Sequence, residues 1–254
     1  MRYSFVIMKI LLELSYVGDG FAGYQVQPNK PTVQSAVQDA LEAVYGERYP
    51  LKGCSRTDAG VHALQYFATY DTDKSIPIES VPNALNSVID KRIAVLSARV
   101  VDDNFHVRHD VLYKEYEYVI LARRTPNPFL SARAWHFPKP MLDDAISRMR
   151  ASATTFVGTH DFSGFMSQGS SVADTTRTVK HLDIIDEGDI IRVRIAADGF
   201  LYNMVRIIVG TLVEVGLGKI EPSEMSDIIA SCERARAGMT APPEGLYLRR
   251  VEFK

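Results

Sequence analysis

The order in which strand-like and helix-like hydrophobic patterns follow one another constrains the fold of this chain more than any other feature. Strand-like runs occur at residues 9–17, 64–70, 93–100 and 111–121. Apolar residues alternate in the first and the last of these runs, as is typical of half-buried strands, and residues 64–70 are rich in aromatic side chains. Between the first two runs, residues 33–44 have helical spacing, with Thr32 as the expected N-cap and Gly46 as the expected end. Strands and helices therefore mix without the strict alternation of a parallel sheet, and we predict an α+β fold.

The second half of the chain repeats this mixture. Further strands are expected at residues 134–137, 176–185, 190–196 and 246–253, and further helices at 141–149, 201–215, after Ser80 and after Pro222. Asp186-Glu187-Gly188-Asp189 is typical of a hairpin turn between two of these strands. In the long run at 111–121, Leu112, Tyr116, Tyr118 and Ile120 are expected on one face. We therefore expect two related halves, residues 1–106 and 107–254, with a cleft between them.

The eleven residues from Gly53 to Ala63 (GCSRTDAGVHA) contain the strongest candidate for chemistry. Asp58 lies among small residues, after Arg56 and before Gly60, and an aromatic strand pattern follows. A carboxylate that the backbone holds on a turn, beside small residues that leave room for a substrate, has the geometry of a nucleophile. Aspartate in a turn also commonly bonds its own backbone, so spacing alone leaves both roles open.

Composition indicates a globular protein and limits the class of site. The chain has 254 residues and can bury roughly 70–75% of its unfolded surface. Cys54 and Cys232 are too far apart for a disulfide framework or a CxxC metal site, which favours a reducing cytoplasm. The net charge of −2 is neutral on nucleic-acid binding, because phosphate affinity depends on local charge.

The chain shows no sign of a targeting or membrane segment. The apolar run from Phe5 to Met8 is too short for a signal peptide, and no apolar stretch reaches membrane-spanning length. Met8 is an alternative translation start to Met1. We therefore expect a cytoplasmic protein without a membrane partner.

Five segments, in the same order along the chain, resemble the tRNA pseudouridine synthase A family. Residues 56–63 are similar to the family's catalytic motif, and the other segments are 14–25, 104–108, 199–206 and 241–248. Tyr24 stands where the family commonly has tryptophan, and Tyr202-Asn203 where it frequently has two histidines. The resemblance implies two pseudo-related α/β halves that share a mainly antiparallel sheet around a central active-site cleft, the pseudouridine synthase fold.

The same resemblance implies an activity and its partners. The family isomerises uridine to pseudouridine in the tRNA anticodon stem-loop, at tRNA positions 38, 39 and 40, and acts as a homodimer. The reaction needs no cofactor, no metal and no redox step, which agrees with a chain that lacks metal-ligand clusters and phosphate-cradling loops.

Three residues are expected to be catalytic by this resemblance. Asp58 is the nucleophile, which adds either to the sugar C1′ or to C6 of uracil. Arg206 is the one charge in an apolar helix and either reaches the surface or pairs inside the protein; the resemblance favours pairing, with Asp58. Tyr116 is expected to stack on the detached uracil and to take its C5 proton directly or through water.

The remaining expected contacts involve the uracil pocket and the RNA. Leu246 and Leu248 are expected to line the uracil pocket, and Tyr118 to fill the core. Arg56 is similar to the arginine that takes the place of a flipped nucleotide, although out of this context it would be a surface arginine on a turn. RNA contacts are also expected from Phe105, His106, Val107, Arg108, His109, Gly169, Ser170 and Arg177.

Two rival functions use the same residues differently. An RNA-binding module without catalysis would have no need for Asp58 beside a buried arginine. A Cys–His hydrolase would use Cys54 and His62, yet no oxyanion hole or third orienting group accompanies them, and we expect His62 to be a hydrogen-bonded structural residue.

Overall fold

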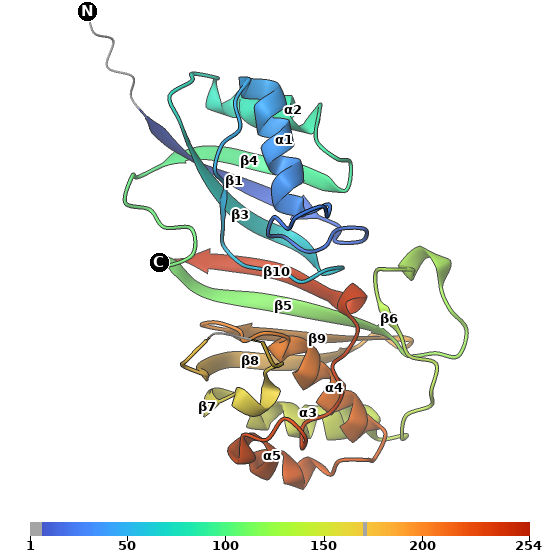
Figure 1. Ribbon diagram of the computed structural model, residues 1–254. Coiled ribbons are helices and arrows are strands. Elements are labelled where there is room, and N and C mark those ends of the chain that lie inside the picture. Colours follow the sequence, from blue (N-terminus) through green and yellow to red (C-terminus); the bar gives the residue numbers. More distant parts are fainter. Residues whose placement is uncertain (1–6, 170–171) are drawn as a thin grey trace, which may run out of the picture. The chain divides into compact units, whose positions relative to one another are not determined.

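The computed structural model describes residues 7–169 and 172–254 (Figure 1). It comprises two compact units, Met1–Leu112 with Leu248–Lys254, and Tyr113–Tyr247. Each unit combines helices with strands that pair mainly antiparallel, so the predicted α+β class is confirmed.

In the first unit, the strand order is β4-β1-β3-β10, and β2 pairs with β3. The strands are β1 (Met8–Tyr16), β2 (Lys52–Gly53), β3 (His62–Thr72), β4 (Ile93–Val101) and β10 (Leu246–Phe253), and the helices are α1 (Val33–Tyr45) and α2 (Val81–Asn86). Helix α1 begins and ends as predicted: Thr32 caps it with its side chain, and Gly46 ends it in the left-handed conformation at φ 74°. Its apolar stripe, including Val37 and Leu41, is buried.

In the second unit, the strand order is β5-β9-β8-β7, and β6 pairs parallel with β5. The strands are β5 (Val111–Leu121), β6 (Trp135–His136), β7 (Gly158–Asp161), β8 (Thr176–Asp186) and β9 (Ile190–Ala197), and the helices are α3 (Ala145–Thr155), α4 (Met204–Gly216) and α5 (Met225–Ser231). The hairpin predicted between β8 and β9 is present, with Gly188 at φ 78° in its turn. The short helix expected after Pro222 is also present, as a 3₁₀ turn that leads into α5.

Two helix starts were predicted too early. Residues 141–144 precede α3, because the amide of Leu142 donates to the carbonyl of Gly216 rather than starting a helix of its own. Helix α4 begins at Met204 rather than at 201, since Asn203 before it has the left-handed φ of 62°. The strands β2 and β7 were not predicted, because two to four residues are too few to show a period.

Strand β5 departs from the simple alternation that its sequence indicates. Leu112, expected on the buried face, is 45% exposed, whereas Glu117, on the opposite face, is only 5% exposed. Two arginines of β9 explain the burial of Glu117: Arg192 donates to it at 2.9 Å and Arg194 at 2.6 Å. A buried carboxylate is tolerated only when it is paired in this way, so both faces of β5 are fixed to their neighbours.

The cap of α1 gives a direct test of the first unit. Thr32→Ala removes the acceptor for the amide of Ser35, which lies 3.2 Å away, and we expect the free energy of unfolding to fall by about 1 kcal/mol in urea denaturation. Thr32→Ser keeps the hydroxyl and should stay within a few tenths of a kcal/mol of the wild type. Equal losses in both variants would contradict the capping role.

Candidate active site

Asp58 lies in the loop that joins β2 to β3, four residues before β3 begins. Its carbonyl accepts a hydrogen bond from the amide of Val61 at 3.1 Å, which closes a turn, and Gly60 within this turn has a φ of 79°. The Asp58 side chain is half-buried. The turn beside a strand end that the sequence predicts is therefore present.

Hydrogen bonds hold the backbone on both sides of Asp58. On the N-terminal side, the Thr57 hydroxyl bonds the Tyr16 hydroxyl at 2.7 Å, and the Thr57 carbonyl accepts from the amide of Tyr24 at 3.0 Å. On the C-terminal side, Nδ1 of His62 accepts from the amide of Gly18 at 3.0 Å. The end of β1 and the segment after it therefore anchor the Asp58 loop at two points.

Two glycines allow this segment to lie directly against the loop. A Cβ on Gly18 would collide with the carbonyl of Val61, and one on Gly23 would lie 2.7 Å from the carbonyl oxygen of Thr57. Gly23 also has a φ of 99°, which side chains rarely adopt. Neither glycine was identified as part of the site from the sequence, although both belong to the segment 14–25 that resembles the family.

Cys54 and His62 are both buried and bonded to backbone. The thiol of Cys54 accepts from the amide of Phe67 at 3.4 Å, and His62 accepts from Gly18 through Nδ1. The hydrogen bonding predicted for His62 is confirmed. A buried thiol and an imidazole nitrogen that is occupied as an acceptor do not match the exposed nucleophile and base of a Cys–His hydrolase.

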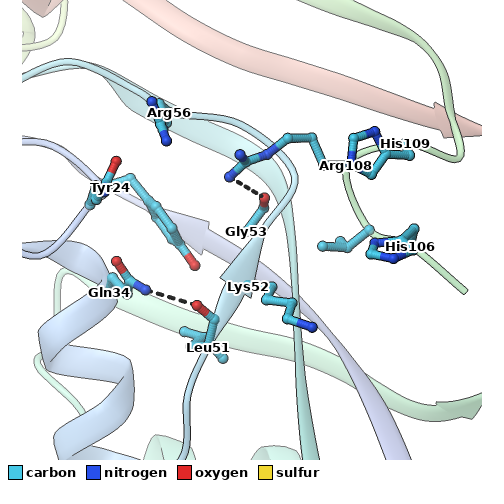
Figure 2. A pocket seen from close by; sticks show the side chains of 11 residues that line it. Tyr24, Gln34, Leu51, Lys52, Gly53, Arg56, His106, Arg108 and His109 are labelled. Carbon is cyan, nitrogen blue, oxygen red and sulfur yellow. Dashed lines mark hydrogen bonds between the residues drawn. The ribbon is translucent and has the colours of Figure 1, made fainter. Parts of the chain in front are cut away.

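The structure gathers most of the expected RNA-contact residues of the first unit around one pocket (Figure 2). The pocket has a volume of 240 Å³ and is lined by Tyr24, Gln25, Gln34, Leu51, Lys52, Gly53, Arg56, His106, Val107, Arg108 and His109. Arg108 donates to the carbonyl of Gly53 at 3.4 Å, and Gln34 to that of Leu51 at 2.8 Å. Three cationic side chains on one concave surface favour an anionic ligand.

One lining residue of the pocket, Tyr24, belongs to an aromatic pair that the sequence did not indicate. Tyr24 stacks on Tyr66 with ring centroids 4.5 Å apart, and burial raises the pKa of the Tyr24 hydroxyl above its ordinary value. The rings of His106 and His109 lie edge to face at 5.1 Å. Phe105 does not line the pocket, because its ring packs against Phe253 at 5.2 Å.

In the second unit, Tyr116 and Tyr118 occupy different environments on β5. Tyr116 is 7% exposed and meets the Phe200 ring edge-on at 5.0 Å. Tyr118 is fully buried and donates its hydroxyl to the carbonyl of Pro242 at 2.6 Å, and burial raises its pKa. Tyr118 is thus a core residue, as predicted.

Arg206 is half-buried on α4, and backbone and side-chain acceptors direct its guanidinium. Nε donates to the carbonyl of Ala241 at 2.6 Å, and one terminal nitrogen donates to Oδ1 of Asn203 at 2.8 Å. Asn203 therefore both precedes α4 and orients its arginine. These two bonds fix the direction of the guanidinium.

The other expected residues are distributed over both units. Leu246 and Leu248 are buried in β10. Arg177, on β8, donates to the carbonyl of Asp174 at 3.0 Å and lies beside Gly199. Gly169 is exposed with a φ of 88°, and Ser170 lies outside the described residues.

Neither metal-binding clusters nor long apolar helices were found in residues 7–169 and 172–254. No three His, Cys, Asp or Glu side chains of these residues are grouped to hold a metal ion. No helix in the same part of the chain is long and apolar enough to cross a membrane.

Comparisons with known proteins give one consistent result. A family model described as tRNA pseudouridine synthase matches residues 14–110 and 152–254. A tRNA pseudouridine synthase A of Thermoanaerobacter sp. (strain X514) is 46% identical over 244 residues, 96% of this chain and 99% of the relative. A protein of the same name in Bacillus subtilis (strain 168) is 41% identical over 248 residues, 97% of this chain and 99% of the relative.

A solved structure with similarity in shape is more distant. A chain of a Cbf5-Nop10-Gar1 complex has 13% sequence identity and a TM-score of 0.38, covering 93% of this chain and 57% of that chain. This similarity is too low to bear on the site.

Gly23→Ala tests the close packing against the Asp58 loop. The new Cβ meets the backbone of Thr57, so we expect a larger loss of unfolding free energy than the roughly 1–2 kcal/mol of a left-handed alanine alone. Gly46→Ala is the matched control, because Gly46 has a positive φ of 74° and nothing within 4 Å of its Cβ position. Urea denaturation measures both, and equal losses would show that Gly23 is required for its φ only.

Proposed function

Because the chain belongs to the tRNA pseudouridine synthase family, we propose that it isomerises uridine to pseudouridine in tRNA. The proposed target is the anticodon stem-loop, at tRNA positions 38, 39 and 40. The observation that carries the proposal is the Asp58 turn: the carboxylate of the family-like motif lies on a loop that hydrogen bonds and two close glycine contacts hold in one conformation.

The proposed chemistry breaks the bond between N1 of uracil and C1′ of ribose and forms one between C5 and C1′. The Asp58 carboxylate adds either to C1′, with uracil leaving as its anion, or to C6 of the ring. After the base turns, C5 bonds to C1′, the C5 proton leaves, N1 is protonated and the carboxylate is regenerated. Atoms and electrons balance within the nucleotide, because the step is an isomerisation.

Two residues of the second unit have proposed roles in this reaction. Arg206 is the proposed cation that keeps the nucleophilic carboxylate ionised, and its fixed guanidinium suits that role. Tyr116 is proposed to stack on the detached uracil and to accept the C5 proton directly or through water. Leu246 and Leu248 are proposed to supply apolar surface to the base.

Binding of the RNA is proposed to involve the pocket of the first unit. Arg56 is proposed to take the position of an extruded uridine; its exposure and its place two residues before Asp58 support this role. His106, Val107, Arg108 and His109 line the same pocket as Arg56, which supports their assignment as RNA contacts. Phe105, Gly169, Ser170 and Arg177 complete the proposed RNA contacts.

We also propose that the protein acts as a homodimer in the cytoplasm, as the family does. Sedimentation of the purified protein tests the oligomeric state. A monomer that turns over at the full rate would overturn the homodimer proposal without affecting the proposed reaction.

Asp58→Asn separates catalysis from binding. We expect release of the C5 hydrogen from uridine-labelled tRNA to fall by more than about 10³-fold, because the amide cannot act as a nucleophile. The affinity for tRNA should change little, and Asp39→Asn, at an exposed carboxylate on α1, should keep full activity. If the wild type bound tRNA without releasing hydrogen, an RNA-binding module would be the better description.

Tyr116→Phe tests the proton transfer separately from stacking. We expect kcat to fall by about 10²–10⁴-fold with KM nearly unchanged, since the ring remains and only the hydroxyl is lost. Tyr113→Phe is the matched control on the same strand, where the ring contacts the Lys180 ammonium at 4.5 Å through its face. A normal kcat for Tyr116→Phe would remove the proton role and leave stacking.

A further inference from the structure

A second cationic surface lies in the second unit, in residues 122–142, here called the basic arm. The basic arm contains Arg123, Arg124, Arg133 and Lys139 and no Asp or Glu, although the whole protein has a net charge of −2. It comprises the loop from β5 to β6, β6 itself and the chain after β6 as far as Leu142; Asp143 and Asp144 follow it directly, before α3. Such a run of cations without acids attracts polyanions locally.

The outer end of the basic arm presents an aromatic ring to solvent. Phe129 is 90% exposed, the largest exposure among the large apolar side chains of the described residues. It belongs to a short 3₁₀ turn, Pro128–Leu130, at the outer end of the lime-green loop in Figure 1. The Phe129 ring is therefore open to solvent and available to stack on another ring.

Hydrogen bonds make this loop rigid. The Arg123 guanidinium donates to the carbonyl of Thr125 at 2.8 Å and pairs with Asp189 at 3.0 Å. The side chain of Asn127 accepts from the amide of Phe129 at 3.1 Å. The backbone that carries Phe129 is therefore held in place, so that binding would order little additional chain.

Two cations of the basic arm remain available to a ligand. Arg124 and Lys139 are exposed, and neither has an ion pair in the part of the chain that the structure describes. Both line a hollow of 650 Å³, whose other lining residues include Leu142, Ile146 and Asp186. Arg123 borders it too, but Asp189 neutralises that charge.

We propose that the basic arm is a second RNA-binding surface, which contacts the tRNA substrate away from the reacting uridine. Phe129 stacks on a base, and Arg124 and Lys139 contact phosphates. That the RNA is tRNA rests on the proposed function, whereas the binding of RNA is inferred from the cations and the exposed ring of the basic arm. Unpaired cations beside an exposed aromatic ring are the combination that binds nucleic acid.

Direct binding of tRNA at several salt concentrations tests the proposal. The double variant Arg124→Ala/Lys139→Ala should weaken binding about tenfold or more at low salt and reduce the slope of log Kd against log salt by roughly 1.4, about 0.7 for each lost phosphate contact. Phe129→Ala should raise Kd by about 5- to 150-fold with the salt slope unchanged, as expected for a lost base stack.

Matched variants control for general effects on the unit. Lys219→Ala removes an exposed cation outside the basic arm, and Val157→Ala truncates an exposed apolar side chain; both should leave Kd and the salt slope unchanged. Thermal unfolding should show the same midpoint for all these surface variants. At saturating tRNA, kcat should also stay near the wild-type value, because the proposed reaction assigns no role to these residues.

Phe129→Trp gives a direct signal of stacking. This variant should bind tRNA like the wild type, and its fluorescence should be quenched on binding, because the native tryptophan, Trp135, is buried. Unchanged tRNA affinity in Phe129→Ala and in the double variant would overturn the proposal. A change in sedimentation of Phe129→Ala without a change in tRNA affinity would also overturn it and identify the arm as a contact between copies.

The outcomes distinguish this inference from the proposed function. Binding is measured without turnover, so weaker binding of the variants supports the basic arm even if the wild type releases no C5 hydrogen. If the wild type released hydrogen fully and every arm variant bound tRNA unchanged, the proposed function would be supported and the proposed role of the basic arm in RNA binding would be overturned.

Discussion

The backbone contact between the Asp58 loop and the segment after β1 is the constraint on which the candidate site depends. The amide of Tyr24 donates to the carbonyl of Thr57, and Gly23 leaves no side chain between the two segments. A loop with a free backbone would let a carboxylate sample many positions. The entropy lost in fixing one position would then add to the activation free energy of the reaction. In this protein the entropy of the loop is lost during folding, because the loop is part of the packed structure of its unit.

A comparable constraint acts on β5 in the second unit. Glu117 is bonded by Arg192 and Arg194 of the adjacent strand, where Glu117 is paired in register with Arg194 and Tyr116 with Ile195. A shift of one residue would move Glu117 to the apolar face and Tyr116 away from it, so the buried ion pairs oppose any slip. The charged face of the strand thereby fixes the position of the aromatic face.

The regular elements could be predicted from the sequence wherever a long period or a cap was present. Helix α1 shows this best, since Thr32 and Gly46 mark its ends by local chemistry alone. The start of α4 could not be predicted, because the left-handed conformation of Asn203 depends on contacts such as its bond to Ser167 at 2.9 Å. In the same way, the motif identified Asp58, but the glycine contacts that hold its loop join residues far apart in the chain.

The distribution of charge explains how a protein of net charge −2 can take a polyanion as its substrate. Many arginines are neutralised within their own unit: Arg48 pairs with Asp39, Arg92 with Asp90 and Arg148 with Glu221. Arg124 and Lys139 border a hollow without an ion pair among the described residues, and Lys52, Arg56 and Arg108 converge on a separate pocket. Net charge counts paired and unpaired cations alike. A phosphate, however, interacts mainly with the cations that lie within a Debye length of it, about 8–10 Å. Affinity for RNA therefore depends on which cations lack a carboxylate partner rather than on their total number.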